Sequence, residues 1–186
     1  MRKYSCLSVV IIVLALGASH LMGAALASAA SAAEIEQGVN AAEKELYAKF
    51  PAAKALAQSA KGILIFPEIV KGGFVVGGLY GEGALRKEGK TVGYYSTVAG
   101  SYGLQAGLQK YGYALFLMTD AVLDYLKKSD GWEIGVGPSI VIVDAGMAKS
   151  MTTTTAKSDI YAFFFDQKGL MAGLGLQGSK ITRISK

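Results

Sequence analysis

The sequence is poor in the side chains that perform acid–base chemistry near neutral pH. Its 186 residues include one cysteine and one histidine, Cys6 and His20, and both lie within residues 1–32. Without cysteine the remainder cannot form a disulfide, so its stability must come from an apolar core. It also lacks the imidazole base of Ser-His-Asp and Cys-His sites and the usual protein ligands of zinc. Histidine-dependent catalysis and structural zinc are therefore excluded for residues 33–186.

The first residues have the three parts of an export signal. Arg2 and Lys3 form a short basic head, and residues 7–26 are an almost uninterrupted apolar run. Residues 25–33 then contain only alanine, serine and leucine. This order predicts a cleavable signal peptide over residues 1–32 and an exported protein, either periplasmic or secreted.

The end of this signal offers two small-x-small sites for a peptidase, at 27–29 and 30–32. The rival interpretation is an uncleaved membrane anchor, because the apolar run is long enough to span a bilayer. Enrichment in serine and alanine at the exit suits a peptidase better than a lipid boundary. Cys6 precedes the apolar run, whereas a lipid-modified cysteine would follow it, so a lipoprotein is not predicted.

The remainder of the chain is weakly basic. Removal of Arg2 and Lys3 leaves 17 of the 19 basic residues against 14 acidic ones, and the net charge falls from +5 to +3. Such a charge allows contact with an anionic lipid or polymer surface, but it is too small to indicate nucleic acid as a partner.

Residues 34–60 have the pattern of helices. Their apolar side chains recur every three to four residues, which places them on one stripe: Ile35, Val39, Ala42, Leu46 and Phe50. Proline disfavours helical geometry in its predecessor, so Phe50-Pro51 divides the segment into two helices. A later helix is predicted from Thr119, a good N-cap, to about Ser129.

From Lys61 onward the chain is glycine-rich and mostly alternates with period two, as strands with one buried face do. Strands are predicted at 62–67, 74–86, 92–108, 113–118, 132–144, 151–156, 159–166, 169–177 and 180–185. Turns are predicted at 87–90, 109–112 and 167–169. The fold class is therefore α+β, with N-terminal helices packed on a strongly curved, mainly antiparallel β-sheet or barrel that has one inserted helix.

Four basic residues are candidates for binding lipid phosphates: Lys71, Arg86, Lys87 and Lys90. If the first long strands pair as a hairpin, Arg86, Lys87 and Lys90 share one tip and Lys71 lies at the other end. Each such residue near an anionic membrane contributes about 1 kcal/mol. The alternative interpretation is an ordinary solubilising turn.

Glu82 is the acidic residue that stands out, because it lies inside a predicted strand on the same side as Tyr80 and Ala84. A structural pair of Glu82 with Arg86 is predicted. The alternative, a carboxylate-dependent enzyme of the kind that uses paired acids, remains open. Six tyrosines in or beside the central strands serve either core packing or an aromatic-lined groove: Tyr80, Tyr94, Tyr95, Tyr102, Tyr111 and Tyr113.

No cofactor and no metal site is predicted. Residues 173–178 match G-x-G-x-x-G in letters. A dinucleotide site needs a helix after these glycines and an acidic residue about twenty positions later, and the sequence supplies neither.

Four ordered segments resemble the SYLF domain, a lipid-binding family that is also described in yeast as an actin-binding module. They are AKGILIFP at 60–67, GFVVGGLYGEG at 73–83, FLMTDAVL at 116–123 and KGLMAGLGLQGS at 168–179, with Gly135-Val136-Gly137-Pro138 between the last two. The resemblance covers about residues 40–184 and identifies residues 33–186 as one SYLF-like lipid-binding domain.

The resemblance implies a non-catalytic domain that binds anionic membrane lipids of the phosphatidylinositol or phosphoinositide type. In eukaryotic members basic residues and an amphipathic N-terminal helix are implicated, whereas helix 34–49 here has mixed charge. Phosphoinositides and actin are poor candidates as partners if the protein is exported from a bacterium. The alternative is a structural or interaction protein of the cell envelope that binds protein or polysaccharide. The sequence does not predict an oligomeric state.

Overall fold

The computed structural model describes residues 29–73, 76–102, 107–129, 131–150, 157–168 and 178–186. The strands predicted at 151–156 and 169–177, and nearly all of the predicted signal, lie outside these residues. No helix within the described part of the chain combines the length and the apolar character needed to cross a membrane.

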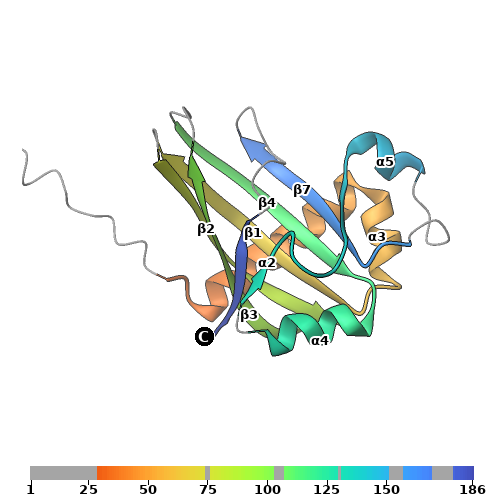
Figure 1. Ribbon diagram of the computed structural model, residues 1–186. Coiled ribbons are helices and arrows are strands. Elements are labelled where there is room, and N and C mark those ends of the chain that lie inside the picture. Colours follow the sequence, from red (N-terminus) through yellow and green to blue (C-terminus); the bar gives the residue numbers. More distant parts are fainter. Residues whose placement is uncertain (1–28, 74–75, 103–106, 130, 151–156, 169–177) are drawn as a thin grey trace, which may run out of the picture.

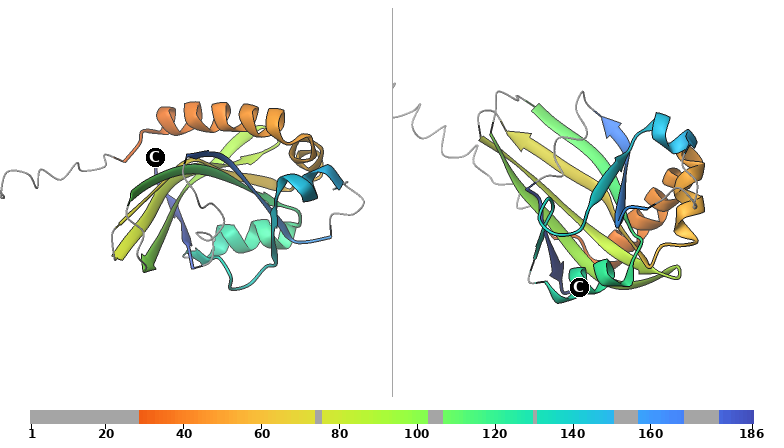
Figure 2. Two further views of the ribbon diagram at one scale, coloured as in Figure 1. Left: turned by 90° about the horizontal axis from the view of Figure 1, so that it is seen from above. Right: turned by 45° about the vertical axis from the view of Figure 1, so that its right-hand side comes forward.

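An eight-stranded sheet curls into a half-barrel between two layers of helices. α2 (Ala32–Lys49) and α3 (Pro51–Ala57) precede it, and α4 (Asp120–Lys128) follows its fourth strand. Seen from above, α2 lies over the arch of the sheet and α4 beneath it (Figure 2). The predicted α+β class is confirmed.

Most neighbouring strands of the sheet are antiparallel, as predicted. The strand order is β5-β8-β3-β2-β1-β4-β7-β6, and within the described residues only the β6–β7 pair is parallel. The strands (Figure 1) are β1 (Gly62–Gly73), β2 (Val76–Lys87), β3 (Lys90–Tyr102), β4 (Gly107–Leu117), β5 (Trp132–Glu133), β6 (Ile140–Val143), β7 (Ile160–Lys168) and β8 (Lys180–Ile184).

The helices begin and end where local chemistry satisfies their backbone. Ser31 and Glu34 form a capping box at the start of α2, in which each side chain bonds the other residue's backbone N–H. Pro51 begins α3, a position that needs no N–H donor. The Thr119 hydroxyl accepts the Val122 N–H at the start of α4. The predicted division at Phe50-Pro51 and the predicted cap at Thr119 are therefore confirmed.

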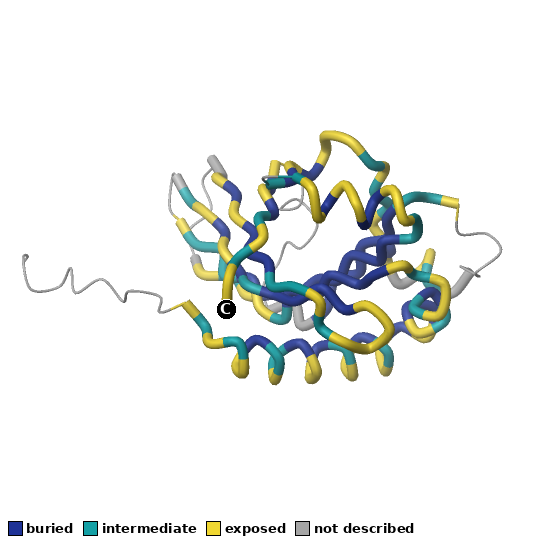
Figure 3. The backbone as a smooth tube through the Cα atoms, turned by 90° about the horizontal axis from the view of Figure 1, so that it is seen from below, coloured by how far each residue is buried: buried dark blue, intermediate teal, exposed yellow. Residues whose placement is uncertain are grey.

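Alternation along the strands gives the sheet two apolar faces. Ile65, Ala84 and Phe116 pack against the stripe Ile35, Val39, Ala42 and Leu46 of α2, whose buried side is turned to the sheet (Figure 3). The strand neighbours of these three residues point to the concave face. Together with Tyr95 of β3 they pack against Val122, Leu123 and Leu126 of α4: Leu64, Phe66, Leu85 and Leu115. One face therefore carries α2 and the other carries α4.

Two predicted boundaries in the first half of the sheet are wrong. The segment 109–112, predicted as a turn, lies inside β4. β1 does not end at Pro67 but continues to Gly73 through a bulge between Ile65 and Glu68. A bulge tolerates proline because the extra residue donates no ladder hydrogen bond.

The second half differs from the prediction in three further places. The strand predicted at 132–144 is two short strands, β5 and β6, separated by turns. A short helix, α5 (Ala145–Ser150), follows β6 as a second inserted helix. Gln167 and Lys168, predicted as the start of a turn, belong to β7.

Two glycines allow the backbone to approach closely around the bulge. A Cβ atom on Gly83 would lie 2.1 Å from the carbonyl oxygen of Ile65. A Cβ on Gly112 would lie 2.3 Å from the Phe165 ring and 2.8 Å from the carbonyl oxygen of Pro67. The bulge at Pro67 and the absence of side chains at these two positions therefore belong to one packing solution.

We expect Gly83→Ala to lower the free energy of unfolding by about 1–3 kcal/mol, because the new methyl group has no room against a backbone oxygen. Gly100→Ala is the matched control, since a Cβ there meets no atom within 4 Å, and it should change stability by less than about 0.5 kcal/mol. Urea unfolding of both variants measures the difference. Equal stabilities would show that the sheet moves apart at Gly83 without cost.

Candidate functional site

The helix-covered face of the sheet is only partly covered. Three successive residues of β2 on this face show the transition. Ala84 is fully buried in the cluster formed with α2. Glu82 contacts Ala30, two residues before α2 begins. Tyr80 is 43% exposed. The sheet beyond Glu82 is therefore open to solvent.

Glu82 lies at the end of the covered part of this face, within a network of charged and polar groups. Its Oε2 accepts hydrogen bonds from Lys186 Nζ at 2.9 Å and from the Ala30 N–H at 3.0 Å. Its Oε1 accepts one from the Tyr80 hydroxyl at 2.6 Å. The side chains of Lys186 and Glu82 are only 9% and 8% exposed. A carboxylate with these partners is held as a structural ion pair.

The electrostatics agree with this role. Burial alone would raise the pKa of Glu82, but the hydrogen bonds from Tyr80 and Lys186 and the charge of Lys186 outweigh it, so the pKa lies below its ordinary value of 4.5. In turn, burial and the neighbouring carboxylate raise the pKa of Tyr80 to about 12. Glu82 therefore stays ionised and Tyr80 protonated at neutral pH.

The structure does not form the predicted pair of Glu82 with Arg86. Arg86 Nη2 instead lies 3.0 Å from Glu36 Oε2 and also donates to Asn40 Oδ1, so it ties β2 to α2. Arg86 is 8% exposed. Four residues along a strand span about 13 Å, so an ion pair between them would need both side chains to lie extended along the strand.

The basic residues predicted to bind lipid lie at opposite ends of the β2–β3 hairpin. Lys87 and Lys90 are exposed and face each other across the turn formed by Glu88 and Gly89, both of which have positive φ. Lys71 pairs with Leu79 at the other end. Arg86 is 8% exposed and is paired with Glu36 of α2. The hairpin therefore presents two of the four predicted residues together.

A row of paired residues crosses the sheet where α2 no longer covers it. Val98, Tyr80, Val70 and Lys110 occupy matched positions on β3, β2, β1 and β4, and Lys180 extends the row on β8. The residues next to these along the strands belong to the concave core: Ala99, Leu79, Ile69, Tyr111 and Ile181. Because strand side chains alternate, the row points to the opposite face, the one on which α2 lies.

The next row toward the end of the sheet is formed by glycines and one leucine. Gly100, Gly78, Gly72 and Leu108 are paired in that order. Leu108 is 67% exposed and Val98 is 49% exposed. We call Val70, Tyr80, Val98 and Leu108 together the open face, with Lys110 and Lys180 as its basic margins.

The two lysines at the margins differ in whether an ion pair neutralises their charge. Lys110 Nζ lies 2.9 Å from Glu68 Oε1, and both side chains are about half exposed. Lys180 is exposed and forms no ion pair within the described residues. Sequence reasoning missed both lysines. The alternating pattern could have found the exposed positions 80 and 98 only if the strand pairing had been known.

The tyrosines divide between the two predicted roles. Tyr95, Tyr111 and Tyr113 are buried in the concave core, where packing is their function. Tyr94 donates to Glu36 of α2 at 3.0 Å, and Tyr80 lies on the open face. The side chain of Tyr102 lies outside the described residues.

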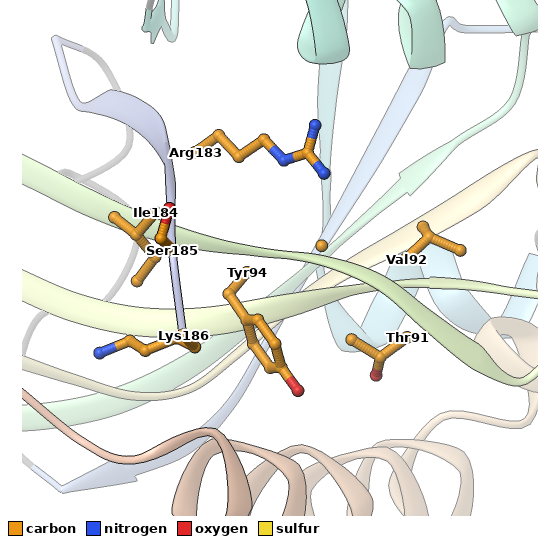
Figure 4. A pocket seen from close by; sticks show the side chains of 8 residues that line it. Thr91, Val92, Tyr94, Arg183, Ile184, Ser185 and Lys186 are labelled. Atoms are coloured by element: carbon orange, nitrogen blue, oxygen red, sulfur yellow. The ribbon is translucent and has the colours of Figure 1, made fainter.

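A groove of about 690 Å³ lies at the edge of the sheet, where β3 extends past the end of β8. In Figure 4, Tyr94 points toward α2 while Arg183 extends away from it on the other side of the strands. Arg183 is exposed and forms no ion pair within the described residues. The groove therefore offers one free guanidinium group, and no three acidic, histidine or cysteine side chains of the described chain gather to hold a metal.

Comparison with known proteins supports the sequence resemblance. Residues 98–186 match the family model Ysc84, described as a Las17-binding protein actin regulator. The match is consistent with the resemblance of the chain to the SYLF domain family. No curated protein matches the chain. The matched range contains β4 to β8 and most of the concave core, while the segments at 60–67 and 73–83 that also resemble the SYLF family precede it.

The charged network around Glu82 should make the stability of the protein depend on pH. A carboxyl group whose folded pKa is lowered stabilises the fold above its unfolded pKa, and this contribution is lost as the pH falls through the folded pKa. We expect Glu82→Gln to destabilise the protein by about 2 kcal/mol at pH 7. The difference in stability between Glu82→Gln and the wild type should become smaller at pH values below 4.5, the ordinary pKa of a glutamate side chain.

Thermal unfolding at several pH values between neutral and strongly acidic conditions measures this gap. Glu45→Gln, at an exposed position of α2, is the control and should follow the wild type throughout. A gap for Glu82→Gln that stays constant with pH would mean that the charge of Glu82 contributes nothing.

Proposed function

We propose that this protein binds anionic membrane surfaces without catalysing a reaction, and that the open face makes the contact. The observation that carries the proposal is the exposure of Leu108, Val98 and Tyr80 together on an uncovered sheet face with lysines at its margins. Apolar groups that enter the headgroup region, beside cations that remain at the phosphates, are the arrangement by which proteins attach to a lipid surface.

The magnitudes favour weak, reversible attachment. Full burial of an apolar side chain contributes about 1.5–3 kcal/mol, and the three side chains here are roughly half exposed, so together they contribute about 2–4 kcal/mol. Each lysine adds about 1 kcal/mol at an anionic surface. Binding should therefore need both contributions and should weaken with salt.

The family match supports a binding role in general. The SYLF family is a family of lipid- and actin-binding modules, and the matched model is named for binding of Las17 and regulation of actin. The pairing of Glu82 with Lys186 also speaks against a free carboxylate base at the position where an enzyme would need one. Export, with attachment to the periplasmic or outer side of a membrane, is proposed from the N-terminal sequence alone.

We expect the protein to float with vesicles of phosphatidylcholine mixed with phosphatidylglycerol and to stay unbound with phosphatidylcholine alone. Val98→Thr/Leu108→Gln should lower the bound fraction, with a loss of about tenfold in affinity, because it removes exposed apolar surface. Lys110→Gln/Lys180→Gln should have a similar effect that vanishes at high salt. Flotation measures both.

Matched controls identify the surface. Val136→Thr/Ile142→Thr changes equally exposed apolar residues outside the open face and should leave binding unchanged. Lys87→Glu/Lys90→Glu tests the hairpin tip and Arg183→Gln tests the groove. If either of these abolishes flotation while the open-face variants bind normally, the open face is not the contact. Absence of binding to any vesicle would overturn the lipid proposal in favour of an envelope protein or polysaccharide as partner.

A further inference from the structure

Residues before α2 are held by the body of the domain. Glu82 of β2 accepts the Ala30 N–H at 3.0 Å, and Lys186 Nζ donates to the Ala30 carbonyl oxygen at 2.7 Å. Lys186 and Glu82 also contact each other. Ala30 is therefore fixed on both of its backbone polar groups by side chains more than fifty residues away in sequence.

Ser31 is equally part of the fold. Its side chain accepts the Glu34 N–H at 3.3 Å, and Glu34 Oε2 accepts the Ser31 N–H at 2.7 Å. A chain cut after residue 32 would lose this capping box and would also remove Ala30 from Glu82. The folded unit therefore begins at Ala30, three residues before the boundary that the sequence alone predicts.

Within the described residues, the charged groups that act around Ala30 are two carboxylates and one cation. Two carboxylates, Glu82 and Glu34, lie within the field of Lys186. The pKa of Glu34 is lowered mainly by its hydrogen bonds from Ser31 and that of Glu82 by its hydrogen bonds from Tyr80 and Lys186, and the charge of Lys186 adds to both effects. Lys186 is the only cation that acts on either of these groups within the described residues. The backbone nitrogen of Ala30 lies at Glu82 Oε2, so a positive charge on this nitrogen would meet a carboxylate that is already in place.

We propose that the chain is processed between Ala29 and Ala30 and that the new α-ammonium group of Ala30 pairs with Glu82. The residues before the bond, Ala27-Ser28-Ala29, form the small-x-small pattern that leader peptidases recognise. Ala29 is exposed. The proposal rests on the export signal and is independent of lipid binding.

The step is a hydrolysis by an endopeptidase of the leader-peptidase class. The bond between the carbonyl carbon of Ala29 and the nitrogen of Ala30 breaks, and water supplies a hydroxyl to the carbon and a hydrogen to the nitrogen. At neutral pH the new carboxylic acid loses its proton and the new amine takes one up. A neutral N–H donor to Glu82 thereby becomes a charged donor at the same position, which strengthens the hydrogen bond.

The first test is the N-terminus of the exported protein. The full chain is expressed with its own leader in an export-competent bacterium, and the product is identified by N-terminal sequencing and intact mass. The expected sequence begins Ala-Ser-Ala-Ala-Glu. A start at Ala33, any other start, or retention of residues 1–29 in every fraction would overturn the proposal.

Two leader variants sharpen this result. Ala29→Tyr should stop cleavage at the proposed bond, because a large side chain does not fit where small residues are read. Ala32→Tyr, at the corresponding position of the second small-x-small site, should leave the start at Ala30. The reverse pattern would assign cleavage to the second site.

The second test is the ionisation of the new amine. In protein that starts at Ala30, the pKa of the α-amino group, followed by NMR, should lie about one unit above its usual value near 7.7–8.0 because Glu82 stabilises the charged form. Glu82→Gln should return it to that value, and Glu45→Gln should not. An unshifted pKa in the wild-type protein would show that the ammonium group does not pair with Glu82.

Discussion

The position at which α2 begins determines which part of the sheet is exposed. The apolar stripe of α2 covers Ile65, Ala84 and Phe116, and the chain just before α2 contacts Glu82. Glu82 is held there by Lys186, Tyr80 and the backbone of Ala30. The uncovered strands beyond it owe their exposure to this one boundary, and so does the constrained start of the helix. The proposed membrane contact and the proposed processing site are two consequences of the same junction.

Patterns with a local cause could be read from the sequence. The spacing of Ile35, Val39 and Leu46 predicted α2, the cap at Thr119 predicted α4, and period two predicted a curved antiparallel sheet. Each of these depends on residues close together in the chain. The turn between β3 and β4 was misplaced because glycine, tyrosine and alternating apolar residues continue unchanged across it, so no change of composition marked the end of β3. The bulge at Pro67 was missed because proline usually ends a strand.

The candidate site depended on contacts that local patterns do not encode. Glu82 and Arg86 share a strand and a face, which suggested a pair, but their partners come from elsewhere: Lys186 for one, and Glu36 with Asn40 for the other. The open face was equally hidden. Val98, Tyr80 and Val70 lie side by side only because three strands pair in one register. Alternation assigns such residues to a face, and only the tertiary structure decides whether that face is covered.

The edges of the sheet bear on how copies of this protein could associate. Within the described residues the outermost strands, β5 and β6, have two and four residues, whereas the central strands have eleven to thirteen. Short outer strands leave few unpaired backbone groups for a second chain to extend. Crowding on a membrane would bring many copies close together. Under those conditions β5 and β6 offer little template for strand-by-strand polymerisation, and association through these two strands would have to use side chains instead of backbone.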